Sequence, residues 1–316
     1  MSNRPRKRVL ITGASSGIGL SVAERFSRAG YDVAMIARGE GLKVAAARVR
    51  EQGGRAYEIR ADVGDHDALK EAIAAAAGML GGLDVAVLNV GIGTFGTFEE
   101  LTKEDFDRVM EVTFTATVDA TRMVLPLLEE GPGTIVYTGS IAGQMPIPMM
   151  SSYTAAKHAL RGFAGALRSE LRTRGSSVNI CIVSPGPVDT PFWPHVGTPA
   201  NRAPSSAPPL AAYDTGSVSA EILRVAEHPR REVTVGGAYK LARAVYAAGG
   251  PVTEAAFGLV MRWKIGKADG EPYDRRSLAR PSGEGMTGGG SFGRPSLLGA
   301  AHMIAGRLRQ NFTQGS

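Results

Sequence analysis

The 316-residue chain contains a single cysteine, Cys181, and few aromatic residues, which make up 6% of the sequence. One cysteine excludes an internal disulfide and any zinc site built from several thiolates. It is consistent with a reducing cytoplasm, where we expect the protein to reside. No run of 18 apolar residues occurs, so the sequence predicts no transmembrane helix. The basic N-terminus lacks the long apolar stretch and the cleavage site of a signal peptide.

Acidic residues are slightly outnumbered, and the formal net charge is +6. From Arg262 onward there are nine basic and four acidic residues, so most of the net charge lies in the C-terminal tail. A basic tail of this kind is typical of a solvated segment, and we expect no nucleic-acid binding. Contact between the tail and a membrane surface is the weaker alternative. The five histidines show no metal-ligand spacing, and we expect no bound metal.

Short apolar runs alternate with stretches of helical spacing along most of the chain. Strands are predicted at 8–12, 32–37, 57–61, 85–89, 133–138, 178–183 and 232–235, and helices between them at 18–29, 41–52, 67–79, 103–129, 151–174 and 217–227. This order predicts an α/β fold with a doubly wound parallel sheet of the Rossmann type and right-handed crossovers.

We divide the chain into one Rossmann-type catalytic domain, residues 1–237, and a C-terminal extension, residues 238–316. Within the domain, residues 191–213 carry six prolines and little periodicity, and we expect a substrate lid at about 191–215. The extension is expected to be helical at first and then partly flexible. Its predicted parts are helices at 239–248 and 253–264, a Gly- and Pro-rich linker at 267–295, and a short terminal helix at 297–309.

A glycine-rich turn joins the first predicted strand to the first predicted helix, with glycines at Gly13, Gly17 and Gly19. Such a turn permits a tight bend, a close approach of the backbone to a pyrophosphate, and close helix–strand packing. The helix that follows offers free N–H groups and a positive dipole to the phosphates. The sequence therefore predicts a dinucleotide site that includes, with these glycines, Ser15, Ser16 and Ile18.

The end of the second predicted strand distinguishes the two nicotinamide cofactors. NAD-binding sheets usually carry an acid there, which binds the ribose 2′-hydroxyl. This chain has Ala37 followed by Arg38, and an arginine can bind a 2′-phosphate through two hydrogen bonds. NADP(H) is therefore favoured over NAD(H), with a solvated Arg38 as the alternative.

Three residues form a candidate catalytic set. Ser140 follows the fifth predicted strand, and Tyr153 and Lys157 lie one helical turn apart on the helix after it. A tyrosine near its ordinary pKa of about 10 is a poor acid or base at neutral pH. We expect the Lys157 ammonium, together with an oxidised nicotinamide, to lower the pKa of Tyr153. Ser140 would hold the carbonyl oxygen of the substrate.

With these motifs the sequence resembles the short-chain dehydrogenase/reductase family over about residues 7–237. The matching motifs are TGASSGIG at 12–19, Asp62-Val63, Asn89-Val90-Gly91, Ser140, the YxxxK pair Tyr153 and Lys157, and PGPVDT at 185–190. The resemblance implies contacts with both halves of the cofactor. In the adenosine half, Asp62 and Val63 would contact the adenine, and Asn89 and Gly91 would lie under the ribose. In the nicotinamide half, Lys157 would bind the ribose, and Val188 and Thr190 would hold the carboxamide, with Pro185 and Gly186 before them in the same motif. It also implies a homodimer or homotetramer formed through the helices at 103–129 and 151–174.

One departure from the family concerns the proton path. By the resemblance, Thr113 stands where family members often have an Asn that holds a water beside the lysine, so we take Thr113 as a candidate fourth catalytic residue. Met149 and Met150 after Ser140, with Phe192 and Trp193 in the lid, favour an apolar substrate surface. The sequence thus predicts an NADP(H)-dependent oxidoreductase acting on a small-molecule carbonyl or secondary alcohol. A non-catalytic NADP(H)-binding sensor or scaffold is the alternative.

Overall fold

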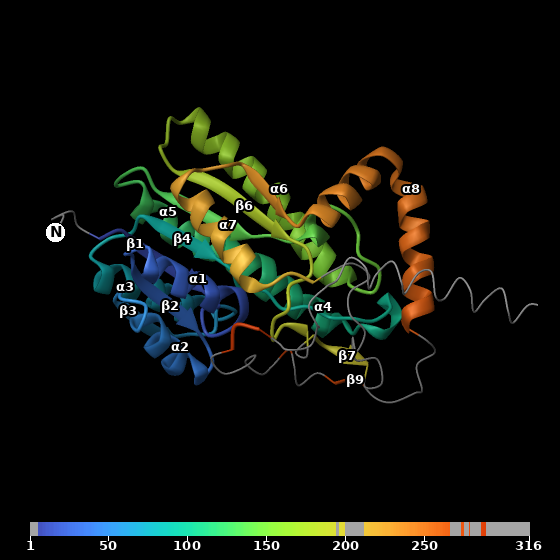
Figure 1. Ribbon diagram of the computed structural model, residues 1–316, viewed down its shortest axis with the longest axis horizontal. Coiled ribbons are helices and arrows are strands. Elements are labelled where there is room, and N and C mark those ends of the chain that lie inside the picture. The colour runs from blue at the N-terminus through green and yellow to red at the C-terminus, as the bar shows by residue number, and fades with distance from the viewer. Residues whose placement is uncertain are drawn as a thin grey trace, which may run out of the picture.

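A parallel sheet forms the centre of the molecule (Figure 1). The computed structural model describes residues 6–193, 196–199, 212–265, 273–274, 278 and 286–288. Seven strands of this part pair in the order β3-β2-β1-β4-β5-β6-β8, all in parallel. They are β1 (Arg8–Thr12), β2 (Asp32–Ala37), β3 (Ala56–Arg60), β4 (Val85–Leu88), β5 (Thr134–Thr138), β6 (Asn179–Pro185) and β8 (Glu232–Val235). The predicted doubly wound sheet is confirmed, and its direction of winding reverses between β1 and β4.

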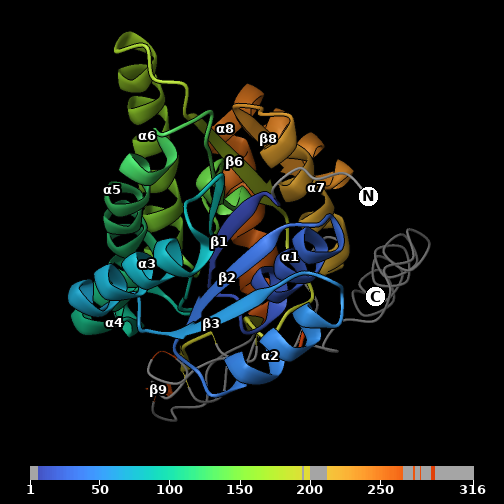
Figure 2. The same cartoon turned by 90° about the vertical axis from the view of Figure 1, so that its left-hand side faces the viewer.

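Helices cover both faces of the sheet (Figure 2). On one face pack α1 (Gly17–Arg28), α2 (Gly41–Arg50) and α7 (Thr215–Glu227); on the other pack α3 (His66–Leu80), α4 (Lys103–Met110), α5 (Ala116–Leu128) and α6 (Ser151–Thr173). The period of a strand explains the division, because successive side chains point to opposite faces. In β1, Val9 and Ile11 join the core under α1, whereas Leu10 joins the core under α3.

The helix predicted over 103–129 is interrupted. A π-helical turn, Glu111–Thr115, separates α4 from α5, and Thr113 lies in it. Such turns insert one extra residue into a helix and often mark functional sites. No property of the sequence signals this turn. Two 3₁₀ turns, Phe98–Glu100 and Ile141–Gly143, precede α4 and follow β5.

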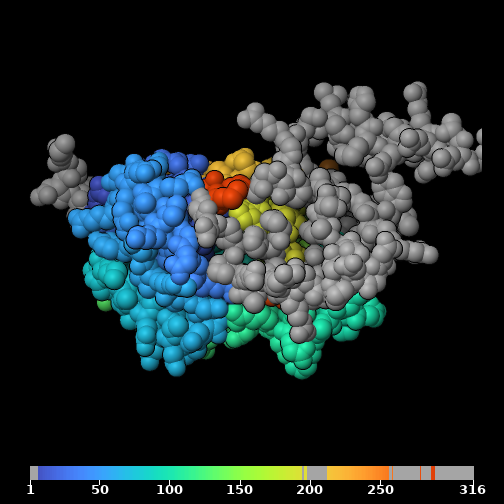
Figure 3. Space-filling view, turned by 90° about the horizontal axis from the view of Figure 1, so that it is seen from below, coloured from blue at the N-terminus to red at the C-terminus, as the bar shows by residue number. Residues whose placement is uncertain are grey.

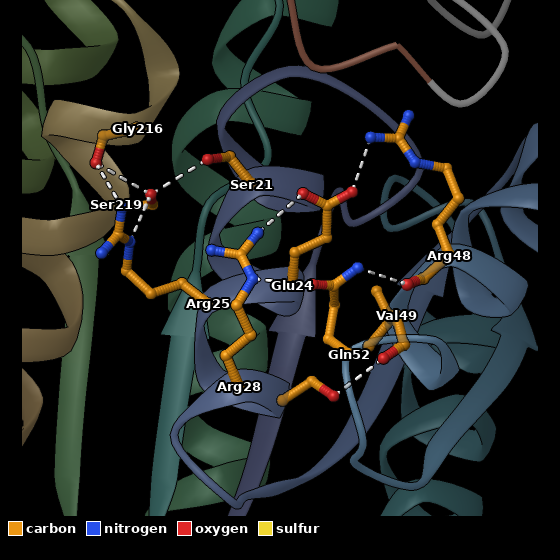
Figure 4. Close-up of polar contacts among 10 residues, drawn as sticks. Ser21, Glu24, Arg25, Arg28, Arg48, Val49, Gln52, Gly216 and Ser219 are labelled. Atoms are coloured by element: carbon orange, nitrogen blue, oxygen red, sulfur yellow. Dashed lines mark hydrogen bonds and ion pairs between the residues drawn. The ribbon is translucent and has the colours of Figure 1, made fainter.

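Polar contacts fasten α1 to its neighbours (Figure 4). The Glu24 carboxylate, which is 8% exposed, is 2.6 Å from the Arg48 guanidinium on α2. On the other side the hydroxyls of Ser21 and Ser219 are 2.9 Å apart, and Arg25 donates to Ser219 at 3.0 Å. These contacts fix α1 between α2 and α7, and with it the position of the helix N-terminus that follows the glycine-rich turn.

The C-terminal extension begins with α8 (Gly237–Ile265), which bends at Gly249 and lies at the far right of Figure 1. The backbone of Gly249 is not helical, with φ of −150° and ψ of 55°, so α8 consists of two helical parts, as predicted for 239–248 and 253–264. Beyond it, β9 (Tyr273–Asp274) pairs antiparallel with β7 (Thr198–Pro199), so the described parts of the expected lid and linker contain a small sheet. Pairing between segments this distant leaves no periodic pattern in either one.

No helix among the described residues is long and apolar enough to cross a membrane. The rest of the predicted lid, at 194–195 and 200–211, lies outside the described residues, as does the predicted terminal helix at 297–309.

Candidate active site

The glycine-rich turn has the backbone geometry that the sequence predicts. Gly13 and Gly17 have φ of +68° and +55°, a region that glycine enters without strain. A Cβ on Gly19 would lie 2.1 Å from the carbonyl oxygen of Gly13, so only glycine fits there. The Asn89 side chain donates to the carbonyl oxygens of Thr12 and Gly13 at 3.3 and 3.4 Å. Asn89 thus ties β4 to the turn across the sheet edge.

The N-terminus of α1 faces the same edge. Ser16 is its N-cap residue, but its side chain makes no capping hydrogen bond. The N–H of Gly17 donates to the carbonyl oxygen of Met286 at 2.7 Å. Ser15 is buried at the turn, and Ile18 is partly buried against the core beneath α1. Because the first N–H groups of a helix have no partner within it, this end of α1 suits an anion.

Arg38 belongs to a charged group at the ends of β2 and β3. Its guanidinium is 3.5 Å from the Asp62 carboxylate, which also accepts from Arg108 at 3.0 Å and from the Gly64 N–H at 3.0 Å. Burial alone would raise the pKa of Asp62, but the Gly64 hydrogen bond and the charges of Arg108 and Arg38 hold it below its ordinary value. Asp62 therefore stays ionised and orients Arg38, while Val63 beside it is buried.

Arg108 is a site residue that the sequence analysis missed. It lies on α4, 46 residues from its partner Asp62, and nothing in its local pattern distinguishes it from a surface arginine. It also donates to Glu111 at 3.0 Å at the start of the π-helical turn. Arg108 thus connects the predicted adenine end of the site with the turn that carries Thr113.

The predicted catalytic residues come together at the carboxyl edge of β5. Tyr153 and Lys157 lie on α6, and the Ser140 side chain is near enough to the Tyr153 hydroxyl to lower its pKa. The Lys157 Nζ donates to the carbonyl oxygen of Thr138 at 2.8 Å and lies 5.6 Å from the centroid of the Tyr153 ring. Ser140 accepts a hydrogen bond from the Ala142 N–H at 3.1 Å, which fixes its hydroxyl.

Burial governs the ionisation of both groups. It raises the pKa of Tyr153 to about 12, although the nearby Ser140 side chain opposes this. It lowers the pKa of Lys157, which is 3% exposed, to about 8. The expectation that Tyr153 has a lowered pKa is therefore not met by the residues of the chain, because the cost of burying a phenolate exceeds the stabilisation that they supply.

Thr113 lies beneath this pair and is fully buried. Its hydroxyl accepts from the Ile92 N–H at 3.0 Å and donates to the Ile92 carbonyl oxygen at 3.0 Å. A Cβ on Gly91 would lie 3.5 Å from the Lys157 Nζ and 3.8 Å from the Thr113 methyl group. Gly91, Lys157 and Thr113 therefore lie close together just after the carboxyl end of β4. The one proton of the Thr113 hydroxyl is committed to the backbone, which favours a positioning role.

The loop after β6 lies beside the glycine-rich turn. Val188 and Thr190 are buried, and a Cβ on Gly17 would lie 3.4 Å from the Thr190 side chain. The Trp193 indole N–H donates to the Val188 carbonyl oxygen at 2.8 Å. Pro185 and Gly186 are buried at the end of β6, where a Cβ on Gly186 would lie 2.2 Å from the Tyr239 ring. Gly186 is thus required for packing against α8.

An apolar wall stands beside Tyr153. Phe95, Met150 and Val196 are buried there, and the Phe192 ring is 5.6 Å from the Tyr153 ring. Met149 has φ of +68°, an unusual value for a residue with a side chain, and packs against this cluster. Of the apolar residues after Ser140, Met145 instead packs in a separate core with Tyr239.

Described residues of the expected linker at 267–295 also contact the site. Leu278 is 4% exposed and packs with Val109 and Ala156, with Tyr153 beside them. Its carbonyl oxygen lies 3.5 Å from the Arg38 guanidinium. With the Met286 contact at Gly17, the tail reaches both the catalytic helix and the glycine-rich turn.

Comparison with known proteins agrees with this geometry. A family model described as short chain dehydrogenase matches residues 7–200. The chain is 32% identical over 235 residues to the uncharacterized oxidoreductase YxnA of Bacillus subtilis, covering 73% of this chain and 66% of that one. It is 36% identical over 195 residues to a 3beta-hydroxysteroid dehydrogenase of Mediterraneibacter gnavus, covering 61% of this chain and 70% of that one.

Solved structures give the same result. An alcohol dehydrogenase from Thermococcus sibiricus, in complex with 5-hydroxy-NADP, superposes with a TM-score of 0.66 at 26% identity. The match covers 74% of this chain and 98% of that chain. A Burkholderia phymatum short chain dehydrogenase/reductase in complex with NAD has a TM-score of 0.70 at 22% identity, covering 80% and 96% of the two chains, and shares the fold. The chain belongs to the short-chain dehydrogenase family. It spans just under two thirds of the length of YxnA, its relative in Bacillus subtilis.

Proposed function

We propose that the protein is an NADP(H)-dependent oxidoreductase that transfers a hydride between the nicotinamide and an apolar carbonyl or secondary alcohol substrate. The observation that carries this proposal is the placement of Tyr153 and Lys157 on α6 beside Ser140, with the Lys157 Nζ 5.6 Å from the centroid of the Tyr153 ring, at the sheet edge that the glycine-rich turn also reaches. A binding protein would not need a phenol, a hydroxyl and an ammonium in that arrangement.

The residues fit a dinucleotide. Gly13 and Gly17 give the turn its positive φ values, Gly19 packs directly against the Gly13 carbonyl, and the N-terminus of α1 offers N–H groups to a pyrophosphate. Ser15, Ser16, Ile18, Asn89, Val188 and Thr190 would complete the contacts. When bound, the nicotinamide would supply the hydride.

Arg38 supports the preference for NADP(H). The end of β2 carries no acid that would repel a 2′-phosphate, and Asp62 holds the Arg38 guanidinium in place. The Thermococcus sibiricus relative was solved with an NADP derivative, although the Burkholderia phymatum structure holds NAD. The preference therefore rests on Arg38.

Tyr153 would deliver the proton. A pKa of about 12 keeps the phenol protonated at neutral pH but makes it a weak acid, so efficient proton delivery would need the positive charge of the oxidised nicotinamide to lower that pKa. Ser140 would hold the carbonyl oxygen within reach of that phenol. Lys157 would stabilise the phenolate that remains, because its ammonium is within a few ångströms of the ring and is largely protonated at neutral pH.

The substrate would lie against the apolar wall of Phe95, Met150, Val196 and Phe192. The hydroxysteroid dehydrogenase among the relatives is consistent with an apolar substrate. A screen of NADPH oxidation with ketones, aldehydes and quinones graded by size and polarity tests the proposal. We expect turnover to increase with apolar surface. Tight NADPH binding without turnover on any of these compounds would instead support a non-catalytic sensor.

We also propose that the chain assembles as a homodimer or homotetramer through α4, α5 and α6. Size-exclusion chromatography with light scattering measures the mass of the assembly directly, and a monomer at all concentrations would contradict this.

A further inference from the structure

We propose that the C-terminal tail, at Leu278 and residues 286–288, is a built-in competitor of the cofactor that must leave the site before NADP(H) binds. This inference rests on the proposed cofactor site. It assigns a regulatory role to a segment that has no catalytic residues of its own.

The first contact lies at the glycine-rich turn. Gly17 is the first residue of α1, so its N–H has no partner within the helix. The Met286 carbonyl oxygen accepts from it at 2.7 Å, and residues 286–288 lie against the N-terminal part of the chain (Figure 3). One N–H cannot donate a strong hydrogen bond to a peptide carbonyl and a pyrophosphate at the same time. The Met286 carbonyl thus takes a donor that the cofactor needs.

The second contact lies at the other anion-binding group. The carbonyl oxygen of Leu278 is 3.5 Å from the Arg38 guanidinium, which we assign to the 2′-phosphate. Two peptide oxygens of the tail therefore stand where phosphate oxygens are expected, one at each end of the adenosine half of the site. A neutral carbonyl is the weaker partner for an arginine, so a charged phosphate can displace it.

The third contact anchors the segment. The Leu278 side chain is 4% exposed and packs with Val109 of α4 and Ala156 of α6, next to Tyr153. Burial of one leucine provides a substantial part of the free energy that keeps such a short segment in place. At its other side β9 pairs with β7, so the tail is also fastened to the expected lid.

Competition within one chain has a defined consequence. The apparent dissociation constant for NADPH equals the intrinsic constant divided by the fraction of molecules whose tail is displaced. Weakening the anchor should therefore tighten NADPH binding, whereas weakening a strap that closes over bound cofactor would loosen it. A competing tail and a closing strap therefore predict opposite changes in the NADPH dissociation constant when the anchor is weakened.

Leu278→Asp in the full-length chain tests the proposal, since an ionised carboxylate is costly to bury in that apolar cluster. We expect the NADPH dissociation constant to fall by roughly threefold or more, with a smaller fall for Leu278→Ala. Leu241→Asp is the matched control, because Leu241 is 67% exposed on α8 and the same change there should leave the constant as in wild type. An unchanged or raised dissociation constant in Leu278→Asp would overturn the inference.

Hydrogen exchange of the Gly17 amide without cofactor gives a second readout. Loss of the Met286 contact should make this amide exchange faster in Leu278→Asp, by roughly tenfold, and leave it unchanged in Leu241→Asp. Equal exchange in all three proteins would mean that the tail does not protect Gly17, and the inference would fail. Failure of the proposed cofactor site is seen separately, as absence of NADPH binding to wild type and to every variant.

Discussion

The Lys157 Nζ donates to the carbonyl oxygen of Thr138 at 2.8 Å while it lies 5.6 Å from the centroid of the Tyr153 ring. The end of β5 thus holds the ammonium close to the phenol without a direct hydrogen bond between them. Thr138, two residues before Ser140, makes this contact through its backbone, so the same strand end positions both partners of Tyr153.

Replacement of the phenol tests the acid role. Tyr153→Phe keeps the ring against Phe192 and removes only the hydroxyl, whose pKa the Ser140 side chain helps to lower. We expect turnover to fall by about 10²–10⁴-fold, the usual contribution of general acid catalysis, with NADPH affinity within a few-fold of wild type. Steady-state kinetics and a binding titration measure the two effects. Turnover that survives the change would mean that another group delivers the proton.

The buried lysine should give stability a specific pH dependence. The pKa of Lys157 is about 8 in the folded chain and about 10.4 in an unfolded one, so between these values the unfolded state holds a proton that the folded state has lost. The free energy of unfolding should therefore rise from pH 8 to 9 by up to about 1.4 kcal/mol relative to Lys157→Met. Denaturant titrations of both proteins measure this difference. A difference that is constant across this range would show that the Lys157 pKa is not lowered.

Cofactor preference should depend on Arg38. Loss of a charge-assisted contact with the 2′-phosphate costs about 2 kcal/mol, so Arg38→Ala should weaken NADPH binding roughly thirtyfold. Binding of NADH, which has no 2′-phosphate, is the internal control and should change much less. Equal affinities of wild type for NADPH and NADH would contradict the assignment.

Thr113 should act by positioning. Thr113→Val removes both hydrogen bonds to the Ile92 backbone, and we expect a loss of about 2 kcal/mol of unfolding free energy. Thr113→Ser keeps the hydroxyl and should lose less. If Thr113 only positions its neighbours, turnover of Thr113→Val can be slower than that of wild type, but its pH profile should have the same midpoints as the wild-type profile. A shifted profile would instead indicate that the hydroxyl takes part in the proton path.

The sequence predicted those features of the site that depend on local spacing. The glycines of the turn and the pair Tyr153 and Lys157 follow from neighbouring positions in one turn or one helix. Arg108 could not be predicted, because its partner Asp62 lies on a different element and only the fold brings them together. The raised pKa of Tyr153 was also missed, since burial is a property of the packed site.

The contacts of the C-terminal tail could not be predicted from the sequence either. Leu278 and Met286 occur in a Gly- and Pro-rich stretch whose composition resembles a linker, and their contacts are with residues more than 100 positions earlier. Likewise β7 and β9 are each two residues long, too short for any strand period to be visible. Contacts of this kind depend on the complete fold and leave no pattern in the sequence.

Isotope tracing shows whether the cofactor hydride and the Tyr153 proton both reach the carbonyl group of the substrate. Wild type and Tyr153→Phe would be incubated with NADPH deuterated at the transferable position of the nicotinamide and with the best ketone from the screen, and the alcohol analysed by mass spectrometry. We predict one deuterium on the carbinol carbon of the wild-type product and at least about a hundredfold less product from the variant. Alcohol without deuterium would mean that the hydride does not come from NADPH, and equal labelled product from both proteins would mean that Tyr153 does not deliver the proton.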